Sequence, residues 1–198
     1  MAATRLDDQA LDVLFREARS FSHWLDEPVT DEQLQAVYEL MKFGPTAANS
    51  CPARLVFVRS EEAKSKLKLC LDAGNVDKSM SAPAVAIIGM DMEFYEQMPR
   101  LFPHNQEARS WYAGKPEKIA AAAEKNSTLQ GAYLMLAARS LGLDCGPMSG
   151  FDANKLNATF FPDGKIKSNF ICALGYGDRD QLYPRGPRLS FDEACSLI

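Results

Sequence analysis

The chain has 198 residues, of which 46% are hydrophobic and 24% are charged, and its formal net charge is −4. These values are ordinary for a globular protein, and the acidic balance argues against nucleic-acid binding, which usually requires a basic face. The length predicts a single domain over residues 1–198.

Secretion, membrane insertion and a structural metal site are not expected. The longest apolar run, residues 132–138, is far shorter than the roughly 20 residues that cross a bilayer. The charged N-terminus does not resemble a signal peptide. Five scattered cysteines without a Cys-x-x-Cys pair are typical of reduced thiols, and two isolated histidines indicate neither zinc nor a catalytic triad. We therefore expect a cytoplasmic protein with no metal, membrane or nucleic-acid partner.

The first part of the chain predicts helices separated by one strand. Apolar spacing predicts a helix over residues 8–19. A capping box at Thr30 starts a second helix, which ends at Gly44-Pro45. The β-branched and aromatic residues 55–58 predict a strand, and Ser60 caps a third helix.

The next segments indicate how the sheet is covered. Residues 73–78 predict a turn followed by a short helix. Residues 84–88 form a continuous apolar run, which is typical of a strand covered on both faces. Residues 92–115 follow as an aromatic excursion, too rich in aromatic residues for a disordered linker. The excursion fits a lid or partner contact, and equally a satellite cluster packed on its own domain.

The longest predicted helix runs from residue 116 to about 141, and Gly142 ends it. Its second half, residues 129–138, is apolar nearly all round, so it fits a central core helix or one partly buried by a second subunit. Residues 142–152 predict a loop, and residues 168–176 a further strand. Asp152 and Ser190 are typical N-caps, so a short helix is predicted after each of them.

Two loops rich in small residues could contact a ligand. Residues 44–54 contain two prolines and one glycine, a composition that fits a connector and a ligand cradle equally well. Residues 142–152 contain three glycines, so their backbone amides could also face a ligand. Arg19 and Ser20 at a helix end fit either a cap or a phosphate site, and capping is the commoner role.

No familiar catalytic side-chain pattern is present. The chain lacks a Walker-type loop, a Gly-x-Gly-x-x-Gly turn and a Gly-x-Ser-x-Gly elbow. What stands out is a set of donor-rich loops together with arginines, a lysine and asparagines. Such a set suits a phosphorylated cofactor with a polar edge, in which case the cofactor performs the reaction. We therefore assign no catalytic side chain.

Four segments in this order resemble the FMN-dependent nitroreductase family. They are Pro-Thr-Ala-Ala-Asn-Ser-Cys-Pro from residue 45, Asn-x-x-Lys at 75–78, Gly-Leu-Asp to Gly-Phe-Asp over 142–152, and Arg188. Together they extend over nearly the whole chain. The resemblance implies an α+β fold of the nitroreductase type, with a central mixed β-sheet, helices on both of its faces and a long buried core helix.

The resemblance also implies which residues bind the cofactor. Arg19, Ser20 and Arg188 would hold the FMN phosphate, and Asn75 and Lys78 would bond the polar edge of the flavin ring. The remaining cofactor-binding residues that it implies are Pro45, Thr46, Ala47 and Asn49, which line the flavin and its ribityl chain, and Pro147, Met148, Ser149 and Gly150, which lie along the ring.

Within the family, the chain resembles the malonic semialdehyde reductases of uracil degradation, notably in residues 94–104, 108–111 and 187–195. This resemblance implies reduction of 3-oxopropanoate to 3-hydroxypropanoate in a ping-pong cycle with NADH or NADPH. It also implies a homodimer with FMN at the subunit interface. The alternatives are a broad-specificity nitroreductase or quinone reductase, a non-catalytic FMN-binding protein and a plain interaction protein whose loops are structural.

Overall fold

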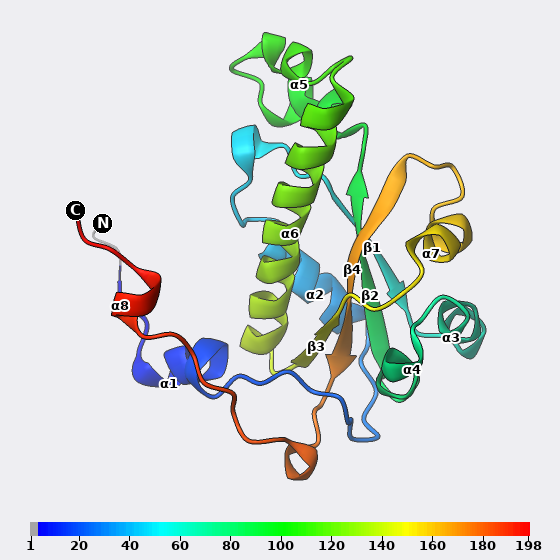
Figure 1. Cartoon of the computed structure of the whole chain (residues 1–198), viewed down its shortest axis with the longest axis vertical. Helices are drawn as coiled ribbons and strands as arrows, with labels where there is room; N and C mark the ends of the chain where they lie inside the picture. Colours follow the sequence, from blue (N-terminus) through cyan, green and yellow to red (C-terminus); the bar gives the residue numbers. More distant parts are fainter. Residues whose placement is uncertain (1–3) are drawn as a thin grey trace.

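A four-stranded sheet forms the centre of the protein, whose computed structural model describes residues 4–198 (Figure 1). The strands are β1 (Ala53–Val58), β2 (Ala84–Asp91), β3 (Asp144–Met148) and β4 (Ile166–Gly175). Their order in the sheet is β1-β2-β4-β3. The apolar run 84–88 lies in the central strand β2, and all five of its residues are buried, as its pattern predicts.

The sheet is antiparallel at all three strand pairings. The family resemblance implies a mixed sheet, and this detail is wrong for the described strands. Within residues 4–198, parallel pairing is confined to an isolated bridge between Ser20 and Cys145. The apolar pattern of a strand predicts how deeply it is buried. It does not predict whether its neighbours run parallel or antiparallel to it, because that depends on the connections between the strands.

Helices cover both faces of the sheet, as expected. The helices are α1 (Asp8–Leu11), α2 (Asp31–Met41), α3 (Glu61–Lys68), α4 (Ala73–Met80), α5 (Met98–Leu101), α6 (Pro116–Ser140), α7 (Ala153–Phe160) and α8 (Phe191–Ala194). Ala86 and Ile88 of β2 face α2 and α6, whereas Val85 and Ile87 face α3 and α7. This alternation follows from the two-residue period of a strand, and Figure 1 shows the two helical layers.

The long helix α6 crosses one face of the sheet and contributes Leu134, Ala137 and Ala138 to the core (Figure 1). Gly142 follows it with a φ of 81°, a left-handed conformation that suits glycine at a helix end. The apolar second half is not buried all round, because Leu129 is 40% exposed. Of the two alternatives, a core helix buried all round within one chain therefore does not fit at this residue.

The aromatic excursion packs as a satellite core at one end of α6. Phe94, Met98 and Tyr112 are buried there, and they pack with Ile119 and Ala123 of α6. The rings of Phe94 and Tyr112 meet edge-on with centroids 4.9 Å apart. The structure thus supports the satellite-cluster interpretation of residues 92–115.

Two segments have more regular structure than their sequence predicts. The predicted loop 142–152 contains strand β3, and Pro147 fits there because β3 is an edge strand, where a residue without an N–H group loses no ladder bond. Residues 73–80 all belong to the helix α4, so the turn predicted at the start of this segment is absent. By contrast, the helix predicted over 8–19 is less regular. Only Asp8–Leu11 is α-helical, and the chain continues as a π-helical turn, Asp12–Arg16, which ends before residue 19.

No helix within residues 4–198 is both long and apolar enough to cross a membrane.

Candidate functional site

A hollow of about 440 Å³ opens between the N-terminal segment, the end of α6 and the C-terminal tail. Its lining residues are Phe15, Ala18, Arg19, Ser20, Arg139, Arg185, Gly186 and Arg188, and we call it the arginine pocket. No acidic residue lines it, and no ion pair in the described part of the chain involves its arginines. Because like charges repel, four gathered guanidinium groups favour binding of an anion.

The N-terminal segment and the tail hold each other in place around this pocket. The guanidinium of Arg19 donates to the carbonyl of Tyr183, and Nη2 of Arg185 donates to the carbonyl of Ala18 over 2.9 Å. Nη1 of Arg188 donates to the carbonyls of Gly186 and Pro187 at 2.9 and 3.0 Å. The tail arginines therefore bond to backbone oxygens and keep further N–H groups for a ligand.

A second group of predicted residues gathers where α4 meets the end of β3. Nδ2 of Asn75 donates to the carbonyl of Gly150 over 2.7 Å. A Cβ atom at Gly150 would lie 2.5 Å from that same nitrogen, so the contact requires glycine. Lys78 lies one turn further along α4, and its carbonyl accepts a 2.9 Å bond from Nε1 of Trp24. We call Asn75, Lys78 and residues 147–150 the α4–β3 cluster.

Lys78 is the free charge of this cluster. Its side chain is partly buried, and none of the ion pairs found in residues 4–198 includes its ammonium group. A partly buried, unpaired cation interacts strongly with a negative charge placed near it. The cluster can therefore bind a ligand with a polar edge that accepts hydrogen bonds, and Lys78 can stabilise negative charge that develops on that edge.

Strand β3 connects the arginine pocket with the α4–β3 cluster. At its start, the amide of Phe21 donates to the carbonyl of Cys145 over 3.0 Å, and Ser20 forms the parallel bridge with Cys145. From Cys145 to Gly150 the chain advances by at most about 17 Å at the rise of a strand. An elongated ligand with an anionic end and a polar ring edge could therefore extend between them.

Not every side chain in this stretch points outward. Pro147 and Ser149 are exposed, whereas Met148 is only 9% exposed and packs in the core. Its Sδ accepts a 3.6 Å contact from Oγ of Ser79. Of the predicted residues 147–150, Met148 can therefore contact a ligand through its backbone but not through its side chain.

The loop 44–54 lies elsewhere, fastened to α6. The amide of Ala47 donates to Oδ1 of Asn126 over 2.7 Å, and the hydroxyl of Tyr133 donates to the carbonyl of Pro45 over 2.9 Å. The amide of Ala53 donates to the side chain of Gln130 over 2.8 Å. Residues 126, 130 and 133 are spaced i, i+4 and i+7 along one helix face. An analysis of apolar spacing misses them, but their polar periodicity is visible in the sequence.

Several donors of the loop are paired with α6, with Leu101 or within the loop itself, and the loop backbone is unusual. The φ angles of Ala48, Asn49 and Cys51 are 49°, 50° and 41°, values in a left-handed region that residues other than glycine rarely adopt. Nδ2 of Asn49 donates to the carbonyl of Leu101 over 2.8 Å, and Oγ1 of Thr46 accepts from the amide of Cys51. Such strain is often found at ligand-binding sites. Pro45, Ala47 and Asn49 are exposed and could contact a ligand through their surface, but they have few free N–H groups for hydrogen bonds.

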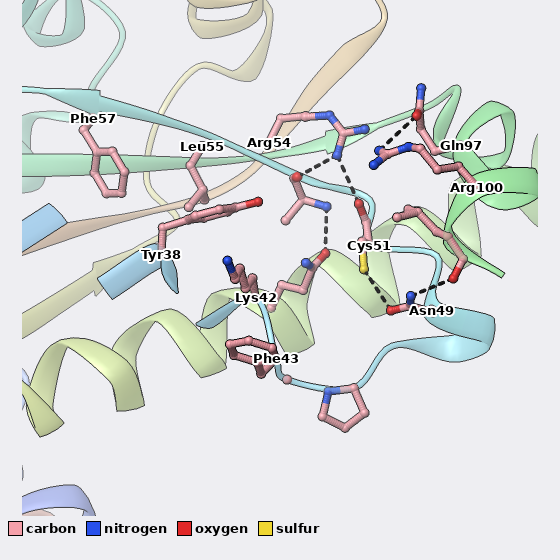
Figure 2. Close-up of a pocket in the computed structure, with 15 residues that line it drawn as sticks. Tyr38, Lys42, Phe43, Asn49, Cys51, Arg54, Leu55, Phe57, Gln97 and Arg100 are labelled. Carbon is pink, nitrogen blue, oxygen red and sulfur yellow. Dashed lines mark hydrogen bonds between the residues drawn. The ribbon is translucent and has the colours of Figure 1, made fainter. Parts of the chain in front are cut away.

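A second hollow, of about 890 Å³, lies on one side of this loop (Figure 2). Its lining residues are Tyr38, Lys42, Phe43, Gly44, Pro45, Asn49, Cys51, Ala53, Arg54, Leu55, Phe57, Gln97, Arg100, Leu101 and Gln130, and we call it the loop pocket. It has three cationic and no acidic lining residues. Nη2 of Arg54 pairs with Asp91 over 2.6 Å, while Arg100 donates to the amide oxygen of Gln97 over 3.2 Å.

The structure therefore divides the predicted site residues into two sets. Arg19, Ser20 and Arg188 share the arginine pocket, which β3 joins to the α4–β3 cluster. Residues 45–49 belong to the separate loop, and no hydrogen bond found in residues 4–198 joins that loop to either group. Arg139 and Arg185 complete the arginine pocket and were not singled out by the sequence.

One carboxyl group near the arginine pocket has a shifted pKa. Asp144 begins β3, and burial raises the pKa of its carboxyl group. The backbone amide of Gly177, which donates to it over 3.0 Å, and the charges of Arg179 and Arg139 act in the opposite direction. The charge of Arg139 therefore acts on this carboxyl group, although no ion pair found in residues 4–198 joins the two side chains.

Comparison with known proteins gives a consistent assignment. The model of the nitroreductase family matches residues 15–176. A protein of Ralstonia nicotianae is 58% identical over 193 residues, covering 98% of each chain, and one of Polynucleobacter asymbioticus is 56% identical over 196 residues, covering 99% of this chain and 100% of its own. Both are provisionally named NADH dehydrogenase/NAD(P)H nitroreductase.

Solved structures show the same fold. A protein from Bacillus subtilis, provisionally named a nitroreductase, superposes with a TM-score of 0.89 at 25% identity, over 97% of this chain and 100% of its own. Another from Exiguobacterium sibiricum, with the same provisional name and in complex with FMN, gives a TM-score of 0.84 at 19% identity, over 99% of this chain and 100% of its own. The α+β fold with its long core helix is thereby confirmed.

Proposed function

Because the chain belongs to the nitroreductase family and is therefore a flavin-dependent oxidoreductase, we propose that it binds FMN and uses NADH or NADPH to reduce a small organic substrate. The names of its relatives favour a broad-specificity nitroreductase, and a quinone reductase is the close alternative. The supporting observation is the placement of the arginine pocket and the α4–β3 cluster at the two ends of β3.

The residues present fit FMN in charge and in order. The arginine pocket offers guanidinium forks, which match the oxygen atoms of a phosphate group. At the other end, Asn75 and Lys78 offer donors and a positive charge for the polar edge of the ring. Bound FMN would supply the redox chemistry, that is, hydride transfer from NADH or NADPH to the second substrate. The protein contributes binding, orientation and a fixed positive charge, so no side chain need act as an acid or base.

We further propose a homodimer in which the loop 44–54 of one subunit covers the flavin bound by the other. The loop is separate from the β3 groups in one chain, which is why a second copy is needed to unite the predicted site. Large apolar side chains also stand exposed, among them Phe43 at 80%, Leu189 at 69% and Leu129 at 40%. A dimer interface that buries them would remove this apolar surface from water.

A narrower candidate substrate is 3-oxopropanoate, as in the malonic semialdehyde reductases. Besides the resemblance in residues 94–104, the charge of the loop pocket favours an acidic substrate. Lys42, Arg54 and Arg100 line it (Figure 2). Lys42 pairs with Glu39 and Arg54 with Asp91, so Arg100 is the cation that carries this argument. Arg100 bonds to a neutral amide rather than a carboxylate, so its charge could pair with a substrate carboxylate.

FMN uptake tests the cofactor assignment. The purified protein should be yellow, or should become yellow on addition of FMN, with about one FMN per chain remaining after gel filtration. A colourless protein that does not take up FMN would contradict both the enzyme and the non-catalytic flavin-binding alternative, leaving the interaction protein with structural loops.

Stopped-flow reoxidation separates the candidate substrates. The reduced protein should be mixed anaerobically with aldehydes, quinones and nitroarenes, and the rate at which colour returns measured for each. Fast return with nitroarenes and quinones supports broad specificity. Fast return with 3-oxopropanoate alone supports the narrower reductase.

Replacing Arg188 with alanine should weaken FMN retention at least about tenfold, because a hydrogen bond to a charged group contributes roughly 1.5–3 kcal/mol. Equilibrium dialysis of the variant and the wild type against FMN measures the change. Arg16, which pairs with Asp8 and Asp12 outside the pocket, provides a control substitution that should leave retention unchanged. Equal retention in Arg188→Ala and the wild type would count against the phosphate role.

A further inference from the structure

We propose that Arg139, in the last turn of α6, is a phosphate-binding residue of the arginine pocket. The proposal rests on the proposed FMN function and adds a residue that the sequence pattern does not assign. Arg139 lines the pocket together with Arg19, Arg185 and Arg188, but it comes from a different kind of element. The other three arginines lie on the N-terminal segment and the tail, outside the regular helices of the described chain.

Arg139 is the rigidly placed arginine of the pocket. Its neighbours Ala137 and Ala138 are buried against the sheet, which fixes the last turn of α6. The side chain is itself partly buried, and its Nη1 donates to the carbonyl of Leu14 over 3.2 Å. A guanidinium group has five N–H donors, so this bond leaves several for an anion. Preorganisation of this kind lowers the entropy lost on binding.

The negative charge of a phosphate group gives a second reason to expect that Arg139 contributes to binding. A phosphate monoester carries about −1.5 to −2 charges at pH 7. Arg185 and Arg188 are exposed on the tail, where screening by solvent and salt weakens their attraction for a ligand. A partly buried arginine at the pocket wall is screened less. We therefore expect Arg139 to contribute at least as much to phosphate binding as either tail arginine.

A purely structural role is the main alternative. On its other side, Arg139 shares a hollow of about 340 Å³ with Asp12, Glu17 and Asp144, and also with Arg179. Arg139 could balance these acids, and a cation is favourable at a helix C-terminus in any case. However, none of the hydrogen bonds or ion pairs in the described residues joins Arg139 to these carboxylates, and its observed bond goes to a backbone oxygen.

Comparison of FMN with riboflavin, which lacks the phosphate, distinguishes these roles. Binding of both flavins to the wild type and to Arg139→Met should be measured by fluorescence titration. We expect the variant to bind FMN at least about tenfold more weakly, while its affinity for riboflavin changes less than twofold. Arg139→Lys, which keeps the charge but loses the fork, should give an intermediate loss for FMN.

Arg179→Met is the matched control, because Arg179 lines the hollow shared with the acids but not the arginine pocket. It should leave the ratio of FMN to riboflavin affinity unchanged. An equal loss of both flavins in Arg139→Met would overturn the proposal in favour of a structural role. An unchanged affinity for FMN would overturn it as well.

Inorganic phosphate provides a readout that does not depend on flavin binding. The ³¹P resonance of phosphate should broaden in the presence of the wild type and broaden less with Arg139→Met. If the wild type binds neither flavin, the proposed function fails, and this comparison alone then decides the role of Arg139. Absence of any difference between wild type and variant would contradict an anion-binding role.

Discussion

Replacing Gly146 with alanine is expected to lower the free energy of unfolding by about 3 kcal/mol, because the new methyl group has no space. An ideal Cβ at this residue would lie 2.4 Å from the carbonyl oxygen of Phe21 and 3.2 Å from the ring of Trp24. A backbone oxygen cannot rotate away as a side chain can, so the segment around Phe21 must move.

The same substitution should strongly weaken FMN binding. Ser20 and Phe21 are paired with Cys145, so displacing their segment disturbs one wall of the arginine pocket. Urea denaturation and FMN titration of the variant measure the two effects. Gly74→Ala provides the control, since nothing lies within 4 Å of its Cβ and alanine is favoured over glycine in a helix. A Gly146→Ala protein with wild-type stability would contradict the close packing of these segments.

Replacing Lys78 with methionine is expected to slow reduction by NADH or NADPH about 100-fold while FMN remains bound. The ammonium group of Lys78 is unpaired within the described residues and lies in the α4–β3 cluster. A fixed positive charge there stabilises negative charge that develops at the polar edge of the ring, and loss of one such group typically costs roughly 10²–10³-fold. Binding persists because the arginine pocket is unchanged.

Anaerobic stopped-flow absorbance measures the rate of reduction in this variant, and redox titration should show a lower reduction potential. The matched control is Lys68→Met, which removes an exposed lysine at the end of α3 that belongs to neither the cluster nor the arginine pocket. Wild-type rate and potential in Lys78→Met would show that Lys78 does not act on the ring. Loss of FMN instead would indicate a binding role.

The elements with strong local signals could be predicted from the sequence. The capping box at Thr30 is present, with Gln33 bonding back to the Thr30 amide over 2.9 Å. The apolar run of β2 and the helix ending at Gly142 are also confirmed. Each of these features is determined by residues close together in the sequence, so helix caps, apolar runs and periodicity are enough to predict them.

Strand β3 could not be predicted in the same way. Gly146 and Pro147 both disfavour a strand locally, and the segment forms one because Gly146 allows the close approach of Phe21 and because Pro147 lies on the sheet edge. Both conditions depend on tertiary structure. The sequence therefore indicated a ligand-contacting loop where the protein has a strand ending at the α4–β3 cluster.

The sequence offered candidates for the site but not their arrangement. The family resemblance pointed to Arg19, Lys78 and Arg188, whereas Arg139 looks like an ordinary polar position near a helix end. No local pattern shows that the loop 44–54 lies apart from β3, because that separation is set by where α6 places its polar side chains.

Anaerobic titration of the FMN-loaded protein with NADH, and separately with NADPH, tests the central claim most directly. We predict that about one equivalent of at least one of the two nucleotides bleaches the flavin absorbance, and that a nitroarene or quinone then restores it. Bound FMN that neither nucleotide reduces would contradict the assignment of this protein as an NAD(P)H-dependent flavin oxidoreductase.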